Sequence, residues 1–441
     1  MLCDSYQETL SAWEYDSPFQ TAPEHTPRLW TSKASGPDGW LAETLRWTAP
    51  ADDGERHAYR VAVSDSLARI LNAVLQSGTV PHCAEFTHGI MHPIYKGKGD
   101  KGDPANFRGI TVSGLLGKVL GIILTDRLYH WQFANNIISP QQTGFMPFHG
   151  VDHHTFTLLE TLRYRMRRHL STTVAYVDYK AAYDNVHLEA AYVTFTRMGL
   201  PAQLVTLLRD WFSSMEVRVQ HGGGATSEPI RPSKGFPQGG VLSPICFALA
   251  VEPLIRFILA TAGEGDGVTV GEGTAAVKIL ILVYADDVVL ISEDRAGITR
   301  LLQRVHEWST ANGFTMGVGA GKTMCQLFPG DWGRRMPAKK DTIPELPPQY
   351  AAQTAPVQVA DLSIPYTNEY KYLGFRITLD LRDASPLRQA TRNTESAIKR
   401  MFPYNMLVAS MPMSLQLQLL KSLALGGSSF ILPFVDIVVD P

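Results

Sequence analysis

Cysteine is scarce in this sequence, and the few cysteines form no recognisable pattern. There are four among 441 residues: Cys3, Cys83, Cys246 and Cys325. They lie far apart, with no CxxC pair and no Cys/His spacing typical of zinc ligands. This scarcity argues against a zinc module and a disulfide framework, and it favours a reducing, intracellular environment.

The sequence also lacks an excess of either charge and any long apolar run. Lysine and arginine number 40 against 42 aspartates and glutamates, for a net charge of −2. No overall positive field indicates nucleic acid, so a polyanion site must come from local patches. No apolar run reaches membrane-spanning length, and the N-terminus, MLCDSYQETL, lacks the features of a signal peptide. We therefore expect a globular protein without a membrane segment, long enough for two or more subdomains.

The most informative stretch is 278–293, KILILVYADDVVLISE. Apolar, largely β-branched residues on both sides of Asp286 and Asp287 predict two buried strands joined by a tight turn. Adjacent carboxylates at a buried turn repel each other and lose hydration unless a cation binds there. Alternatively, the two acids serve only as turn residues. The stretch by itself leaves both interpretations open.

A further acid ends a second predicted strand, 172–179 (TTVAYVDY). Alternation puts Val174 and Tyr176 on the same face as Asp178, although an aspartate here could instead cap a helix. If this strand neighbours the 278–293 hairpin in one sheet, the three carboxylates converge. Such oxygen ligands suit a pair of Mg²⁺ ions about 3.5–4 Å apart, which promote in-line phosphoryl transfer.

Three loops carry further signals. In GFPQGGVLSP (235–244), glycines allow the backbone to approach a partner, and Ser243 and Pro244 are expected to cap and begin a helix reaching residue 262. The lysine- and glycine-rich tip between predicted strands at 90–95 and 110–112 could bind phosphates or form a solvated turn. The segment 313–323, GFTMGVGAGKT, is similar to a Walker A loop, but Met316 replaces its first glycine, so we reject an NTPase.

Helical periodicity and end signals predict the remaining elements. Residues 50–56 are expected to form a loop. Helices are predicted at 64–77, 115–128, 152–170, 187–198, 201–212 and 296–312, a hairpin at 370–378, and two helices after residue 385.

The order of these segments resembles a reverse transcriptase, specifically of the non-LTR (LINE-type) retrotransposon group. YADD (284–287) is similar to the family's catalytic hairpin, and DYKAAYDNV, starting at Asp178, resembles its first catalytic motif. GFPQGGVLSP resembles the template and nucleotide loop, and IYKGKGDKGDPANFRGITV (94–112) resembles the fingers hairpin. QTGF (142–145), the 313–323 segment, KYLGF (371–375) and an upstream SGPDG (35–39) follow in the family's order, so the resemblance spans roughly residues 33–430.

The resemblance implies a role for each matched residue. Asp178, Asp286 and the main-chain carbonyl of Tyr179 would bind two Mg²⁺ ions, or Mn²⁺, with Asp287 supporting the pair. Tyr183 would act as a steric gate against a 2′-hydroxyl, and Lys96 and Arg108 would bind the triphosphate. Gln238 would contact the template–nucleotide pair, and Lys322 would protonate the pyrophosphate. Two positions depart from the family's pattern: Gly240 stands where a serine is common, and His149-Gly150-Val151 replaces a basic stretch.

The implied fold is α+β, a right-hand polymerase with fingers, a palm built on an antiparallel sheet, and a helical thumb. The expected domains are an extension at 1–80, fingers and palm at 81–380, and a thumb at 381–441. The implied activity is RNA-directed DNA polymerisation with an RNA template, a DNA primer and dNTPs, and with any endonuclease or RNA-binding module supplied separately. The alternative is a catalytically silent or domesticated, maturase-like protein that binds RNA.

Overall fold

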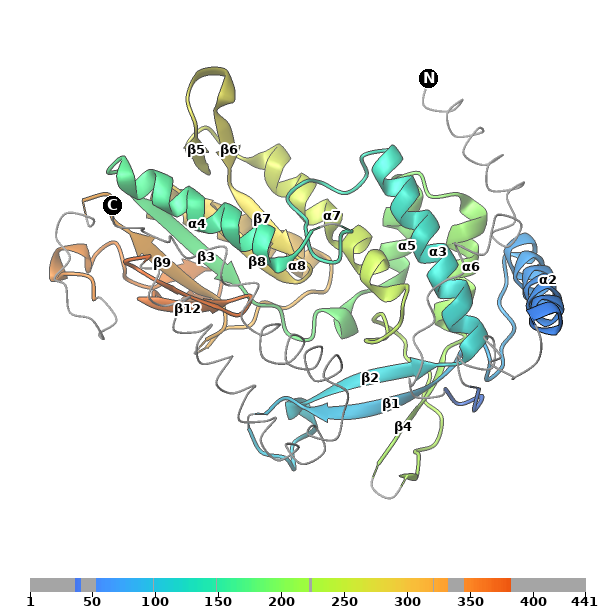
Figure 1. The fold of residues 1–441 in the computed structure, drawn as a ribbon. Helices are drawn as coiled ribbons and strands as arrows, with labels where there is room; N and C mark the ends of the chain where they lie inside the picture. Colours follow the sequence, from blue (N-terminus) through green and yellow to red (C-terminus); the bar gives the residue numbers. More distant parts are fainter. Residues whose placement is uncertain are drawn as a thin grey trace, which may run out of the picture. The chain divides into compact units, whose positions relative to one another are not determined.

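A computed structural model describes residues 36–40, 53–97, 99–147, 149–221, 224–319, 321–331 and 345–381 (Figure 1). The chain divides into two compact units, each assembled from two separate stretches. The first unit comprises Met1–Ile138 and Ala181–Pro253, and the second comprises Ser139–Lys180 and Leu254–Pro441. The predicted helices after residue 385, and with them nearly all of the expected thumb, lie outside the described residues. The expected domain boundaries stay predictions.

The first unit contains a three-stranded sheet in the order β2-β1-β4. Its strands are β1 (His88–Tyr95), β2 (Phe107–Ser113) and β4 (Glu216–Val219). The two predicted strands, β1 and β2, are confirmed and pair antiparallel. Strand β4 was not predicted, and it pairs parallel with β1. Strand β4 has only four residues, and its parallel partner is distant in the chain. The local sequence therefore carries little signal for this strand.

The described helices that lie wholly in the first unit are α2 (Asp53–Ser77), α3 (Leu115–Ala134), α5 (Leu188–Arg197) and α6 (Ala202–Ser213). Helices α5 and α6 contact each other and bury apolar faces that include Phe195 and Leu208. The predicted loop at 50–56 is wrong from residue 53 onward, because α2 begins there, eleven residues before the expected helix at 64. An acidic residue type is favourable at a helix start as well as in a loop, so the DDG signal was ambiguous.

Helix α7 (Ser243–Thr261) begins in the first unit and ends in the second. Among the described helices it is the one long and apolar enough to cross a membrane, which corrects the expectation that no such segment exists. Core helices pass the same test of length and composition, and 61 % of its apolar window is buried within the protein. The Ser243 hydroxyl donates to the Pro237 carbonyl at 2.8 Å, a contact not foreseen from its expected capping position.

The second unit is organised around a four-stranded antiparallel sheet in the order β7-β8-β3-β9. The strands are β3 (Thr172–Val177), β7 (Ile281–Tyr284), β8 (Asp287–Ser292) and β9 (Met324–Phe328). Helix α8 (Arg295–Ala311) contacts β3 and β8, and α4 (Val151–Arg167) contacts β7. Both faces of β3 are buried. Val174 and Ala175 are consecutive and therefore point to opposite faces of the sheet, and both are fully buried. The predicted strands β3, β7 and β8 and both helices are confirmed to within three residues, whereas β9 was not predicted.

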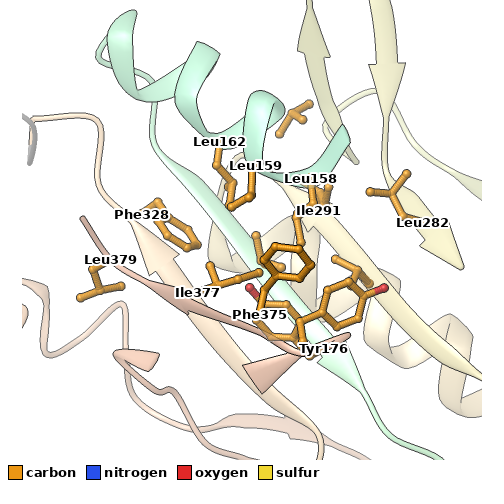
Figure 2. Packing of buried hydrophobic residues seen from close by; sticks show 14 residues of the cluster. Leu158, Leu159, Leu162, Tyr176, Leu282, Ile291, Phe328, Phe375, Ile377 and Leu379 are labelled. Carbon is orange, nitrogen blue, oxygen red and sulfur yellow. The ribbon is translucent and has the colours of Figure 1, made fainter. Parts of the chain in front are cut away.

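One hydrophobic cluster joins α4 to the sheet and to a hairpin (Figure 2). Leu158 and Leu162 of α4 meet Tyr176 of β3 and Phe375 of the hairpin β12 (Glu369–Tyr372)–β13 (Phe375–Thr378), which confirms the predicted hairpin. The Tyr176 ring stacks on Tyr370, with centroids 4.1 Å apart and an interplanar angle of 8°. Two smaller hairpins complete the unit: β5 (Val268–Val270) with β6 (Val277–Ile279), and β10 (Val357–Val359) with β11 (Leu362–Ile364).

Candidate active site

The three acids singled out in the sequence lie near the same end of the second unit's sheet. Strands β3 and β8 pair antiparallel with Val177 opposite Val288, and Val174 and Tyr176 lie in the cluster under α4 together with Val289 and Ile291. If this register continues by one residue, Asp178 lies opposite Asp287. Alternation then places both on the face of the sheet that carries Tyr176 and Val289. Asp286 is adjacent in the turn that joins β7 to β8. The expected neighbourhood of the two strands is confirmed.

The turn itself contains an unusual backbone conformation. Tyr284 pairs with Asp287, so Ala285 and Asp286 form the connection. Ala285 has a φ of 57°, in the left-handed region that a residue with a Cβ adopts only at a cost. The amide of Gln142, from the QTGF segment, hydrogen-bonds the Ala285 backbone. The sequence placed QTGF only in the order of family motifs and gave its glutamine no role.

The carboxyl group of Asp287 is strongly perturbed. The residue is exposed at the surface, but the surrounding protein desolvates its carboxyl group and so raises the pKa. The negative charges of Asp286 and Asp178 raise it further, to about 7. The contributions of Asp286 and Asp178 indicate that both carboxylates lie near enough to act on the charge of Asp287. A cation bound near Asp287 would lower this electrostatic cost.

Lys322 supplies a cation from within the same unit. Its ammonium donates to both carboxylate oxygens of Asp178, at 3.1 and 3.0 Å. The backbone of the 313–323 segment reinforces this contact, because Gly317 N–H donates to the Asp178 carbonyl at 2.7 Å. A Cβ at position 317 would lie 2.5 Å from Asp178 Oδ2, so a larger residue there would displace this carboxylate. The 313–323 segment, which does not match a Walker A loop, thus contacts Asp178 through both its backbone and the Lys322 side chain.

The main chain of Tyr179 pairs with the 313–323 segment, whereas its side chain is buried against helix α8. It forms an antiparallel bridge with Met316, and the flanking hydrogen bonds are made by Lys180 N–H to Thr315 and by Gly317 N–H to Asp178. The Tyr179 carbonyl is therefore not used by this bridge. Its phenol is buried and hydrogen-bonds the Ser309 hydroxyl at 2.8 Å.

The donor set suits Mg²⁺, because carboxylate and carbonyl oxygens are its preferred protein ligands. The repulsion that raises the Asp287 pKa is of the kind a divalent ion relieves. In the part of the chain that the structure describes, no three acidic, histidine or cysteine side chains are close enough to form a ready-made metal site. The residues fit the ion in chemistry, although Lys322 already occupies both carboxylate oxygens of Asp178.

Tyr183 and Gln238 lie together in the first unit. The Tyr183 ring stacks on Phe247, with centroids 4.1 Å apart and an interplanar angle of 8°. Phe236 N–H donates to the Tyr183 carbonyl at 3.0 Å, and the Gln238 amide donates to the Asp184 carboxylate at 3.1 and 3.2 Å. These contacts attach the GFPQGGVLSP loop to the second half of the DYKAAYDNV segment.

Lys96 and Arg108 belong to the β1–β2 hairpin of the same unit. Arg108 is exposed on β2 opposite Ile94. Lys96 is also exposed and donates from its ammonium to the Ala105 carbonyl at 2.7 Å. The ring of Tyr95 contacts Phe107, with centroids 5.5 Å apart, and the Lys101 ammonium lies 5.5 Å from the Tyr95 ring centroid. The tip therefore carries solvent-exposed cations on a braced hairpin.

Comparison with known proteins identifies the family. The family model described as reverse transcriptase (RNA-dependent DNA polymerase) matches residues 96–377. The Pol polyprotein of the Drosophila melanogaster element R2DM is 28 % identical over 354 residues, covering 80 % of this chain. A probable RNA-directed DNA polymerase from the D. melanogaster X-element is 22 % identical, covering 71 %. The chain spans 29 % and 31 % of the lengths of these two relatives.

Solved structures give a more distant match. Apo telomerase from Candida tropicalis, truncated from its C-terminal domain, is 11 % identical with a TM-score of 0.43, covering 72 % of this chain and 59 % of that one. The family assignment rests on the sequence match, which takes in well over half of the residues. The chain belongs to the reverse transcriptase family, with distant relatives among the polymerases of non-LTR retrotransposons.

Proposed function

We propose that this protein is an RNA-directed DNA polymerase that adds deoxynucleotides from dNTPs to the 3′-hydroxyl of a primer. One observation carries the proposal. The register of β3 against β8 brings Asp178 beside Asp287, with Asp286 next to them in the turn. Phosphoryl transfer depends mainly on positioning and on neutralising negative charge, and this cluster offers the ligands for both.

Asp178, Asp286 and the Tyr179 carbonyl would hold two Mg²⁺ ions, with Mn²⁺ as an alternative, and Asp287 would support them. When bound, the ions would activate the 3′-hydroxyl and neutralise the triphosphate. Asp287 would contribute through its charge and by accepting hydrogen bonds at the turn. The raised pKa of this carboxyl group, about 7, indicates that its charge is costly until a cation is nearby.

Lys322 would act at the leaving group. Its ammonium is held by Asp178 and its side chain is 45 % exposed, so it can rotate toward a bound triphosphate without unfolding the loop. Release from Asp178 would at the same time free that carboxylate for metal. As a general acid it would then donate a proton to the departing pyrophosphate.

Four residues of the first unit would bind substrate. Lys96 and Arg108, exposed on one hairpin, would contact the triphosphate. Tyr183, fixed by its stack on Phe247, would meet the sugar and exclude a 2′-hydroxyl. Gln238, bound to Asp184, would lie beside the template–nucleotide pair.

We propose a right-hand organisation on the same basis. The β1–β2 hairpin would belong to the fingers, the β7-β8-β3-β9 sheet to the palm, and residues 381–441 to a helical thumb, with an extension at 1–80. The template would be RNA and the primer DNA. An endonuclease or RNA-binding module would come from a separate part or protein.

Primer extension on an RNA template tests the activity. Incorporation of dNTPs should require Mg²⁺ or Mn²⁺, and Asp286→Ala should reduce it to background. Asp361→Ala is a matched control, because Asp361 is an exposed acid in the same unit. Activity that survives Asp286→Ala, or that needs no metal, would refute the mechanism.

The competing proposal is a reverse-transcriptase-like protein that binds RNA without synthesis, as a domesticated maturase-like protein would. The Lys322–Asp178 ion pair favours it, because an ammonium on Asp178 opposes metal binding. Salt-dependent RNA binding without incorporation, under any primer or metal, would support this alternative.

A further inference from the structure

Gln142 makes a specific set of contacts with the acidic turn. Its side chain is almost fully buried, at 2 % exposure. The Ala285 and Gly144 N–H groups both donate to Gln142 Oε1 at 2.9 Å, and Gln142 Nε2 donates to the Ala285 carbonyl at 3.4 Å. One amide therefore holds the polar groups on both sides of a single residue, Ala285.

The backbone around Gln142 holds this amide in place. Val283 N–H donates to the Gln141 carbonyl at 2.8 Å, and Thr143 N–H donates to the Val283 carbonyl at 3.0 Å, so the segment forms a parallel bridge along the edge of β7. The fit at Gly144 is closer still. A Cβ at that position would lie 2.1 Å from the Ala285 nitrogen, which leaves no room for any other residue type.

Ala285 needs such support because its conformation is unfavourable. It is buried and has a φ of 57°, where alanine is strained and glycine is not. A strained residue persists only when its surroundings hold it. Released from Gln142, Ala285 would relax toward negative φ, and the following carboxylate, Asp286, would point in another direction.

We propose that Gln142 is a positioning residue for catalysis: its amide holds Ala285 in the left-handed conformation and thereby aims Asp286 and Asp287. This inference rests on the proposed polymerase function. It assigns to the QTGF segment a task that its sequence does not reveal. Gln142 itself touches neither substrate nor metal.

A matched pair of variants separates positioning from general stability. Gln142→Met keeps the side-chain length and removes the amide. The control is Gln326→Met, since Gln326 is fully buried in β9 and its amide bonds Tyr176, Asn368 and Ile377. Both variants should melt at lower temperature. We expect Gln142→Met to lower kcat by about 10²-fold with little change in the KM for dNTP, and Gln326→Met to keep kcat.

A double variant tests the mechanism of positioning. Glycine accepts a φ of 57° without strain, so the loss caused by Gln142→Met should be clearly smaller in an Ala285→Gly background. An equal loss in both backgrounds, or a wild-type kcat in Gln142→Met, would overturn the proposal. A parallel loss of kcat in Gln326→Met would do the same, because both effects would then reflect stability alone.

Amide hydrogen exchange gives a readout that needs no activity. Gln142→Met should speed exchange at Ala285 and Asp286 and leave the β3 amides protected. Unchanged exchange at the turn would refute the inference. If wild-type protein extends no primer, or if Asp286→Ala does, the polymerase proposal fails, while the exchange result still decides the role of Gln142.

Discussion

The Lys322 ammonium lies 3.0 Å from Asp178 Oδ2, so a cation of the protein itself neutralises the carboxylate proposed to bind metal. The two residues are 144 positions apart in the chain. Their contact makes metal binding a competition between two cations, with consequences that can be measured before any catalysis occurs.

Lys322→Ala should therefore strengthen divalent metal binding to the free protein. A partly exposed ion pair is worth about 0–1 kcal/mol, so the Kd for Mn²⁺ should fall by up to about fivefold. Isothermal calorimetry would measure it, with Lys371→Ala, an exposed lysine of β12, as the control. Equal or weaker Mn²⁺ binding in Lys322→Ala would show that the ammonium does not compete.

Asp38→Ala should destabilise the start of α3. The N-cap position of this helix is Gly114, which has no side chain, and Asp38 from the SGPDG turn accepts the Leu115 N–H at 2.5 Å in its place. Loss of a capping acceptor lowers the free energy of unfolding by about 0.5–2 kcal/mol, and Asp38→Asn should retain most of it.

Urea unfolding would measure the difference, with Asp65→Ala, an exposed acid on α2, as the control. Identical midpoints for Asp38→Ala and wild type would show that the cap contributes nothing to stability.

His154 should make stability fall in mild acid. It is buried between Thr143 and Tyr372, at 2.9 and 2.7 Å, and burial lowers its pKa to about 4. Between that value and its usual pKa of about 6.5, the unfolded chain binds a proton that the folded protein does not. Stability from this group is present above pH 6.5 and is lost as the pH falls toward 4.

The loss should amount to about 2 kcal/mol between pH 7 and 5. Chemical unfolding at several pH values would measure how steeply the free energy of unfolding falls with decreasing pH. This slope should be smaller in His154→Gln than in the wild type. The control His221→Gln, at an exposed histidine, should keep the wild-type slope. A slope unchanged in His154→Gln would assign the acid sensitivity to other groups.

Tyr183→Ala should raise ribonucleotide incorporation relative to deoxyribonucleotide incorporation by about tenfold or more, because it removes the ring that we propose excludes a 2′-hydroxyl. Tyr183→Phe keeps the ring and its stack on Phe247 and should keep the discrimination. Steady-state incorporation of each nucleotide would measure the ratio. Unchanged selectivity in Tyr183→Ala would remove the gating role.

Local patterns predicted many of the described elements well. Helix α8 begins and ends within one residue of its predicted range, and both strands of the acidic hairpin are where β-branched residues placed them. The two failures have different causes. Strand β4 depends on a partner more than a hundred residues away, and the start of α2 follows a DDG signal that suits a loop equally well.

The sequence by itself determined which side chains could do the chemistry, because apolar runs with acids at their ends are local features, and it determined the order of motifs that indicates the family. Only the tertiary structure decided that Asp178 faces Asp287, that Lys322 pairs with Asp178, and that Gln142 holds Ala285. Strand register and contacts across more than 140 residues arise from the packing of α4, α8 and the sheet as a whole. No single stretch of chain contains that information.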